Sequence, residues 1–187
     1  MQKQLVITVT GNDRVGIVDD VTKIILAYQA NVEASRMARL GGEFAMLMLV
    51  SVAEDQRSGL EESLNNLRSQ GFELAIRPTE PTAAQSFVGW CSYQVGVRGA
   101  DHEGIIHEVA HQLAEQGANV EAIDTSTEDA PFGGTKLFTM SATVLAPPTL
   151  SQASLQEELD AVGQELNVDI TVVQLGDYAI GSPEGAR

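Results

Sequence analysis

Apolar and polar residues alternate at the start of the chain, where Leu5, Ile7 and Val9 occupy every second position. Alternation with a period of two is typical of a strand that buries one face. From residue 17 the spacing becomes helical, and the apolar residues form one stripe at Ile17, Val18, Val21, Ile24 and Ile25. This segment predicts a strand, a glycine-containing turn and an amphipathic helix.

Two more strands and a second helix follow. The segments "ANVEASRMARL" and "GGEFAMLMLVSV" predict strands joined by a glycine hairpin. The second of them has one apolar face, formed by Phe44, Met46, Met48, Val50 and Val52. The next helix has its apolar residues at Leu60, Leu64 and Leu67. Ser58 lies three residues before Glu61, which predicts a capping box, and "FELAIRP" predicts a last strand.

The same pattern occurs again 88 positions later. The turn "TGNDRVGIVDDV" corresponds to "RGADHEGIIHEV", and "ANVEA" at residues 30–34 recurs letter for letter at 118–122. The matching strands and helix have apolar residues at Tyr93, Val95, Val97, Phe138, Met140, Ala142, Val144, Leu155, Leu159 and Val162. Ser154 and Glu157 repeat the capping-box spacing, and "VDITVVQL" supplies a last strand. The second hairpin, "TSTEDAPFGGTK", is longer than the first. A repeat in this register indicates a duplicated structural unit.

The element order β-α-β-β-α-β, present twice, predicts an α+β protein of two ferredoxin-like units. Each unit is an antiparallel sheet with both helices on one face. We expect a first domain at 1–78, a linker at 79–89, a second domain at 90–175 and a flexible tail at 176–187. The other face of the first sheet carries Ala45, Leu47 and Leu49, which are too apolar to remain comfortably in water. We therefore expect packing between units and a homo-oligomer.

The charge of the chain narrows the classes of partner. There are 26 Asp and Glu against 11 Lys and Arg, giving a formal net charge of -15. Binding to nucleic acid depends on Lys and Arg that neutralise phosphates, so direct contact with DNA or RNA is not expected, nor is an anionic membrane surface. No apolar stretch approaches the ~20 residues needed to cross a bilayer. The first residues lack a secretory signal and Cys91 is the single cysteine, so we expect a cytoplasmic protein.

The repeated turn is the main candidate for function. Gly11 and Gly99 are predicted to allow unusual backbone angles, and Asp13 and Asp101 stand where a helix N-cap belongs. Gly16 and Gly104, further along, would let a neighbouring group approach the start of the helix. That group is either a neighbouring part of the protein or a small anion such as a carboxylate, held by free N–H groups and the helix dipole. The residues alone leave both readings open.

Several catalytic motifs are incomplete. The G-x-x-x-x-G spacing of the turn lacks the Lys and Ser or Thr of a phosphate-binding loop, and no dinucleotide fingerprint is present. "HEVAH" matches the zinc-protease helix, but His107 and His111 each lie about 160° around the helix from the apolar Val109 and should face solvent. No third ligand is apparent, and Cys91 is expected to be a packing residue. We expect no catalytic or structural metal, no cofactor and no enzyme activity; adventitious binding of zinc or nickel by His107 and His111 stays open.

The repeated Gly-x-Asp-x-x-Gly-Ile turn, the βαββαβ order and "ANVEA" resemble the ACT domain family. The form "DRVGIV" is similar to the glycine cleavage system transcriptional repressor family, which has two ACT domains. The resemblance implies a regulator that senses a small amino acid, glycine or similar, and acts through a protein partner such as a transcription factor. The alternative is a ligand-free interaction module.

The same resemblance implies which residues contact the ligand. They lie in the loop after the first strand of each unit and at the following helix-to-strand turn. Because Asn12 and Arg14 become Ala100 and His102 in the second copy, we expect the first loop to be the binding loop if only one functions. The implied contacts are Gly11, Asn12, Asp13, Arg14, Gly16, Ile17 and Asn31, and Gly99, Ala100, Asp101, His102, Gly104, Ile105 and Asn119.

Overall fold

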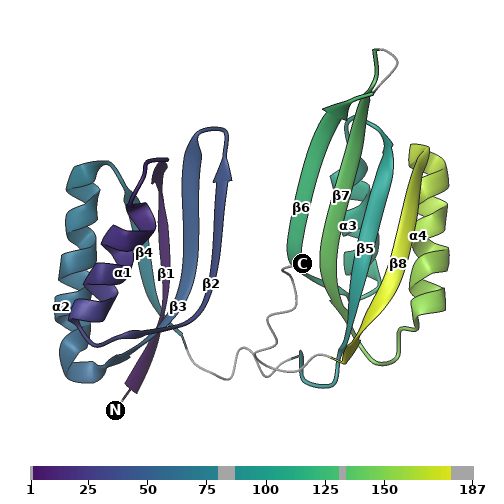
Figure 1. The fold of residues 1–187 in the computed structure, drawn as a ribbon. Coiled ribbons are helices and arrows are strands. Elements are labelled where there is room, and N and C mark those ends of the chain that lie inside the picture. The colour runs from purple at the N-terminus through teal and green to yellow at the C-terminus, as the bar shows by residue number, and fades with distance from the viewer. Residues whose placement is uncertain (1, 80–86, 131–133, 178–187) are drawn as a thin grey trace. The chain divides into compact units, whose positions relative to one another are not determined.

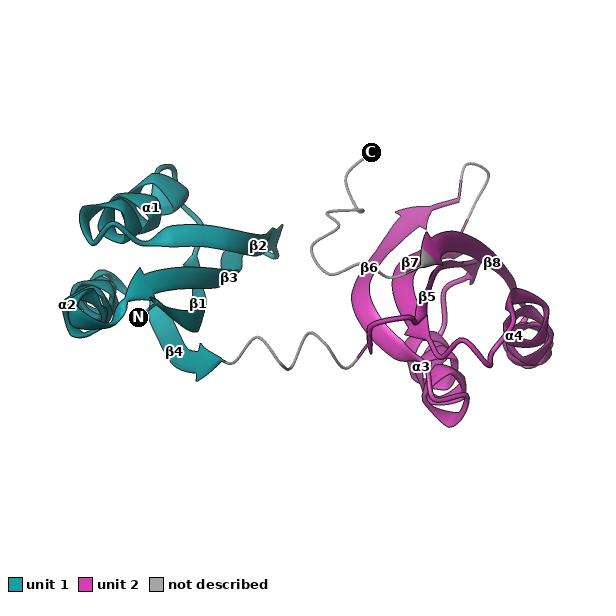
Figure 2. Cartoon of the chain, turned by 90° about the horizontal axis from the view of Figure 1, so that it is seen from below, with its two compact units in different colours: residues 1–83 teal, residues 84–187 magenta. Residues whose placement is uncertain are grey.

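A computed structural model describes residues 2–79, 87–130 and 134–177 (Figure 1). The chain divides into two compact units, Met1–Ala83 and Ala84–Arg187, which are coloured separately in Figure 2. Residues 80–86 of the predicted linker and 178–187 of the predicted tail lie outside the described part. Gly176, which was expected in the tail, belongs to the last strand instead.

The first unit has the predicted βαββαβ order. Its sheet is antiparallel, with strand order β2-β3-β1-β4, and a short 3-10 turn, η1, precedes the last strand. The elements are β1 (Gln2–Asn12), α1 (Ile17–Ala27), β2 (Asn31–Leu40), β3 (Glu43–Ala53), α2 (Glu54–Asn65), η1 (Asn66–Gln70) and β4 (Glu73–Thr79).

The second unit repeats this topology with strand order β6-β7-β5-β8. In both units the two helices lie against the same face of the sheet (Figure 2). The ferredoxin-like α+β prediction is therefore confirmed. The elements are β5 (Cys91–Ala100), α3 (Ile105–Glu115), β6 (Asn119–Asp129), β7 (Lys136–Ala146), α4 (Gln152–Leu166) and β8 (Val168–Asp177).

Each unit has its own core between its sheet and its helices. In the first, Met46, Met48 and Val50 on β3 are at most 1% exposed, as their alternation predicts. In the second, Phe138 and Met140 on β7 have the same role. Removing these side chains from water is the main force that holds each sheet to its helices.

Both predicted capping boxes are wrong. Ser58 lies inside α2, which begins at Glu54 after an uncapped Ala53. In α4 the cap is Ser151, whose hydroxyl accepts a hydrogen bond of 3.1 Å from the Ser154 N–H. Both helices begin several residues earlier than the apolar stripe alone indicated, because their first turns are polar and exposed.

The second hairpin is longer than the first, as predicted. Residues 130–135 connect β6, which ends at Asp129, to β7, which begins at Lys136, whereas residues 41–42 connect β2 to β3. Half of "TSTEDAPFGGTK", residues 125–129 and 136, is paired strand. Residues 131–133 lie outside the described part.

The open face of the first sheet exposes Leu47, as expected, between Thr8 on β1 and Arg36 on β2. Leu47 on β3 is 47% exposed and Leu40 at the end of β2 is 83% exposed. Among the described residues, none of the helices has the length and apolar character that a membrane crossing requires.

Candidate functional site

The loop from Asp13 to Gly16 connects β1 to α1 and is held at its first residue. The Asp13 N–H donates to the Gly42 carbonyl, at 2.9 Å, in the β2–β3 hairpin. The equivalent bond in the second unit joins the Asp101 N–H to the Lys136 carbonyl at 2.8 Å. Each loop therefore sits against the adjoining hairpin of its own unit.

The N-caps of α1 and α3 are glycines. Gly16 has φ of 93° and Gly104 has φ of 96°, in the left-handed region that a Cβ disfavours. The first helical bonds run from Asp20 N–H to Gly16 O and from Glu108 N–H to Gly104 O. Neither N-cap makes a side-chain cap hydrogen bond. The prediction that Asp13 and Asp101 cap these helices is therefore wrong, and the first-turn N–H groups are left for another acceptor.

The carboxylate of Asp13 has a different partner. Its Oδ2 lies 2.6 Å from Nε of Arg39, near the end of β2. The Asp13 side chain is 28% exposed, so this ion pair neutralises the one acidic group at the front of the first loop.

Arg14 is also occupied. Its Nη2 lies 2.7 Å from Oδ2 of Asp20 and donates to Oε1 of Gln70 at 3.1 Å. The guanidinium carbon lies 5.3 Å from the centre of the Phe72 ring, within the range of a cation–π contact. The positive charge predicted to contact a ligand is thus engaged by the unit itself.

His102 replaces Arg14 in the second loop and makes a comparable bridge. Its Nδ1 lies 2.9 Å from the Glu103 carbonyl, and its Nε2 lies 2.7 Å from the Leu166 carbonyl at the end of α4. A carbonyl only accepts, so both ring nitrogens must carry protons for both bonds to form. The two backbone bonds, first to Glu103 and then to Leu166, raise the pKa of His102 above its usual value.

A shallow depression opens beside this second loop. The predicted site lacked four residues of its wall, Glu103, Ile106, His107 and Phe138. The repeat could have suggested Phe138, because β7 takes the place in the second unit that β3 has in the first. The lining residues are Asp101, His102, Glu103, Gly104, Ile105, Ile106, His107 and Phe138. In the described part of the chain, Asp101 forms no ion pair.

Two predicted contacts lie at the wrong end of the sheet. Asn31 pairs with Ser51 of β3, whereas Gly11 pairs with Phe44, so about 24 Å of strand separates them at roughly 3.4 Å per residue. In the second unit Asn119 is displaced from Gly99 in the same way. Within its own unit, neither asparagine can share a small ligand with the loop.

Two further candidates are core residues. Ile17 is 3% exposed and Ile105 is 2% exposed, so their side chains are packed inside their units. Their backbone N–H groups, in the first turn of each helix, are the atoms that remain available.

Gly11 and Gly99 have a packing role. Neither has a positive φ, which corrects the prediction of unusual backbone angles. A Cβ at Gly11 would lie 2.6 Å from Phe72 Cδ1, and one at Gly99 would lie 2.6 Å from Val168 Cγ1. These glycines let the loop-bearing strand approach the start of β4 or β8 closely.

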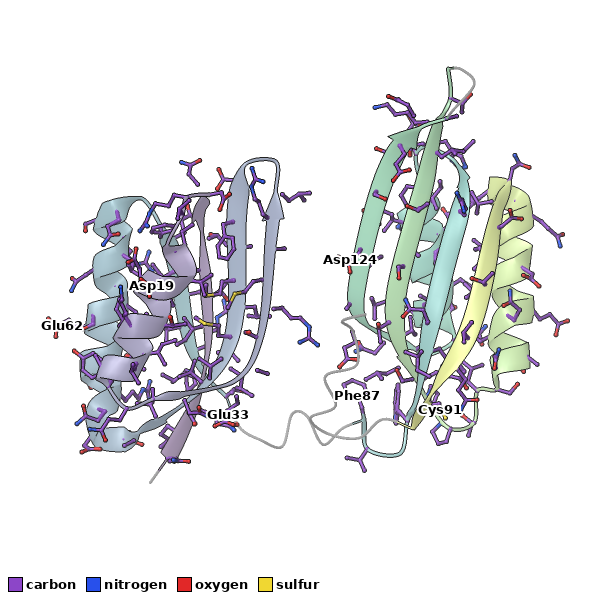
Figure 3. The ribbon with its side chains drawn as sticks, viewed as in Figure 1. Asp19, Glu33, Glu62, Phe87, Cys91 and Asp124 are labelled. Carbon is purple, nitrogen blue, oxygen red and sulfur yellow. The ribbon has the colours of Figure 1, made fainter. Side chains whose placement is uncertain are left out.

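The histidines of "HEVAH" lie on the outer side of α3. His107 and His111 are exposed, as predicted, and their rings stack with centroids 6.1 Å apart. Across the described residues, no group of three or more His, Cys, Asp or Glu side chains is placed to hold a metal ion. Cys91, labelled in Figure 3, is partly buried against the second core, which confirms its packing role.

Comparison with known proteins assigns the family. A model of the ACT domain matches residues 3–77. A UPF0237 protein of Methanopyrus kandleri is 40% identical over 80 residues, covering 42% of this chain and 81% of that protein. The chain belongs to the ACT domain family. Because the second unit repeats the topology of the first, it has the architecture of a tandem ACT-domain protein.

Longer relatives extend over both units. The glycine cleavage system transcriptional repressor of Escherichia coli strain K12 is 28% identical over 179 residues, covering 95% of this chain and 94% of that protein. A crystal structure of a protein of unknown function from Galdieria sulphuraria has a TM-score of 0.78 at 37% identity, covering 94% of this chain and 99% of that one. A second, provisionally named a glycine cleavage system transcriptional repressor, has the same fold, with a TM-score of 0.69 at 24% identity over 95% and 99% of the two chains. This tandem ACT-domain protein thus resembles the repressor over nearly its whole length.

Proposed function

We propose that this tandem ACT-domain protein is a non-enzymatic regulator that binds a small amino acid, glycine or similar, and acts through a protein partner. Its likeness to the Escherichia coli repressor over 179 residues supports the regulatory part. The setting that this likeness supports is transcriptional control of amino-acid metabolism, with a transcription factor as the partner.

The observation that carries the ligand proposal is the uncapped helix start in both units. Gly16 and Gly104 make no side-chain cap, so the first-turn N–H groups point out of the helix without an acceptor from the cap residue. These groups and the positive end of the helix dipole attract an anion, and an amino acid offers a carboxylate.

The described side chains favour the second loop over the first. The acidic side chains in the first turn of α1 do not decide this, because Asp19 pairs with Lys23 and Asp20 pairs with Arg14. What differs is the loop carboxylate. Asp13 is neutralised by Arg39, while Asp101 forms no ion pair within the described residues and keeps a carboxylate that a ligand's ammonium group can meet.

A protein partner agrees with the charge of the chain. At a net charge of -15 the surface repels nucleic acid, so control of transcription would pass through another protein. Ligand binding would shift the population between two states of the protein that the partner distinguishes.

The test is calorimetric titration of the full chain with glycine, serine and the other common amino acids. Asp101→Asn and Asp13→Asn form a matched pair, since each removes one charge at the same loop position with little change in volume. We expect saturable binding that weakens at least tenfold in Asp101→Asn and stays within twofold in Asp13→Asn. The reverse result would assign the first loop, and no heat at protein concentrations able to detect millimolar affinity would reject the sensor.

A ligand-free interaction module is the second candidate. The observation that favours it is the exposure of two large apolar side chains, Leu47 and Leu40, on the open face of the first sheet. Large exposed apolar patches commonly mark protein contacts. This reading predicts that Leu47→Lys abolishes partner binding while every amino acid leaves it unchanged.

A further inference from the structure

The outer side of α3 carries two stacked imidazoles that the regulatory role does not use. His107 and His111 are four residues apart, so they lie one above the other at successive turns of the helix. Their ring centroids are 6.1 Å apart and their planes differ by 15°. Both side chains are exposed, so no core packing resists their rotation.

This spacing suits the chelation of one metal ion. Two histidines at i and i+4 on a helix are the pair that zinc-dependent proteases use, each supplying one nitrogen at about 2.0–2.1 Å from the ion. Small rotations about the side-chain torsions would bring one nitrogen of each ring onto a shared ion. Imidazole suits Cu²⁺, Ni²⁺ and Zn²⁺ and is a poor ligand for Mg²⁺ or Ca²⁺.

The first unit shows that the pair is particular to α3. The 88-residue repeat places Asp19 and Lys23 where the second unit has His107 and His111. There the two side chains form an i,i+4 ion pair on α1, where Figure 3 labels Asp19. The same helix position therefore carries a self-neutralising pair in one unit and two metal-ligating groups in the other.

The neighbourhood of the two imidazoles attracts cations. Glu108 lies between them in the sequence and is exposed. His107 also lines the depression that contains Asp101 and Glu103, so an ion on the pair would lie at its rim. The net charge of the chain, -15, raises the local concentration of any divalent cation.

We propose that His107 and His111 form a binding site for one divalent transition-metal ion, with Cu²⁺ bound more tightly than Ni²⁺ or Zn²⁺. Two protein nitrogens hold the ion, and its other coordination positions remain open to water. The site lies on the outside of α3 and is separate from the uncapped helix N–H groups proposed to bind a carboxylate.

Titration of the full-length, tag-free protein with CuCl₂, NiCl₂ or ZnCl₂ at neutral pH tests this site. We expect one ion per chain, at least tenfold weaker binding in His107→Ala and in His111→Ala, and affinity within twofold of wild type in His102→Gln. The matched gain-of-site variant is Asp19→His with Lys23→His, which transfers the pair to α1. Its stoichiometry should rise from one ion to two.

The outcomes separate cleanly. Failure to see saturable binding at millimolar metal, or unchanged binding in both single alanine variants, overturns the site. A circular dichroism spectrum equal to that of wild type establishes that each variant is folded, because the substituted side chains are exposed. No amino acid is present in this titration, so its failure leaves the proposed sensing function untouched.

Discussion

Replacing Gly99 by alanine should destabilise the second unit, because the new Cβ would clash with Val168. Gly99 pairs with Val168 in the β5–β8 ladder. A Cβ at Gly99 would lie 2.6 Å from Val168 Cγ1, 2.9 Å from its Cβ and 3.0 Å from its Cα. Carbon atoms in good contact are about 3.5–4.0 Å apart, so all three distances are too short. The last one involves backbone, which a side-chain rotation cannot move.

The expected cost follows from two opposing terms. Overpacking a well-packed site costs about 1–3 kcal/mol, and Val168 is β-branched with one strongly preferred rotamer. Against this, alanine restricts the unfolded chain more than glycine does, which contributes about 0.4–1 kcal/mol in favour of folding. We expect a net loss of about 1–2 kcal/mol from the free energy of unfolding.

Denaturant unfolding followed by the fluorescence of Trp90 measures this loss. Trp90 is the single tryptophan and lies in the second unit, with its ring 4.9 Å from that of Phe87. The control is Gly96→Ala on the same strand, where the new Cβ meets only the Thr171 hydroxyl, which can rotate away. We expect the control to cost less than about 0.5 kcal/mol. Equal midpoints for Gly99→Ala and wild type, or equal losses in the two variants, would refute the packing argument.

Three further outcomes are expected. Hydrogen bonds to two carbonyls raise the pKa of His102 in the folded protein, so protonated His102 stabilises the fold. This stabilisation is present below the ordinary histidine pKa and is lost as the pH rises through the pKa of the folded state. The stability of wild type, measured by urea midpoints, should therefore exceed that of His102→Gln by more at pH 5.5 than at pH 8.5. Arg39→Ala should cost less than about 1 kcal/mol by the same measurement, since the Arg39 side chain in its ion pair with Asp13 is 70% exposed. Thr127→Arg, which gives the second unit the residue equivalent to Arg39, should weaken amino-acid binding in calorimetry at least tenfold by neutralising Asp101. An unchanged affinity in Thr127→Arg would remove Asp101 from the proposed site.

The fold was predictable because the same pattern of apolar spacing occurs in both halves of the chain. Period-two and helical spacings in the first copy recur in the second, so each element had two independent indications. The errors concern helix starts, where Ser58 and Ser154 resemble caps but lie inside α2 and α4. Polar first turns lack an apolar stripe that would mark their start. α2 begins directly after β3, and α4 begins after the Ser151 cap. The predicted limits of linker and tail remain predictions where they fall outside the described residues.

The site was predictable as a loop but not as a set of contacts. The sequence alone could not show that Asp13 forms an ion pair with Arg39, because that contact depends on the register of β2 against β3 and of β3 against β1. Nor could they show that Asn31 starts β2 at the far end of the sheet. One signal was present and unused: at the 88-residue offset, Arg39 becomes Thr127.

The change from Arg39 to Thr127 removes the ion pair from the second loop. Arg39 pairs with Phe44, which pairs with Gly11, and Thr127 pairs with Phe138, which pairs with Gly99. The two positions are therefore equivalent in space within their units, but threonine cannot neutralise a carboxylate. The first loop is held by the ion pairs Asp13–Arg39 and Arg14–Asp20. The second keeps Asp101 and is bridged by His102, whose pKa is raised by its hydrogen bonds to two backbone carbonyls. One closed and one open copy of the turn suit the proposed sensing function, in which one unit supports the structure and the other responds to the ligand.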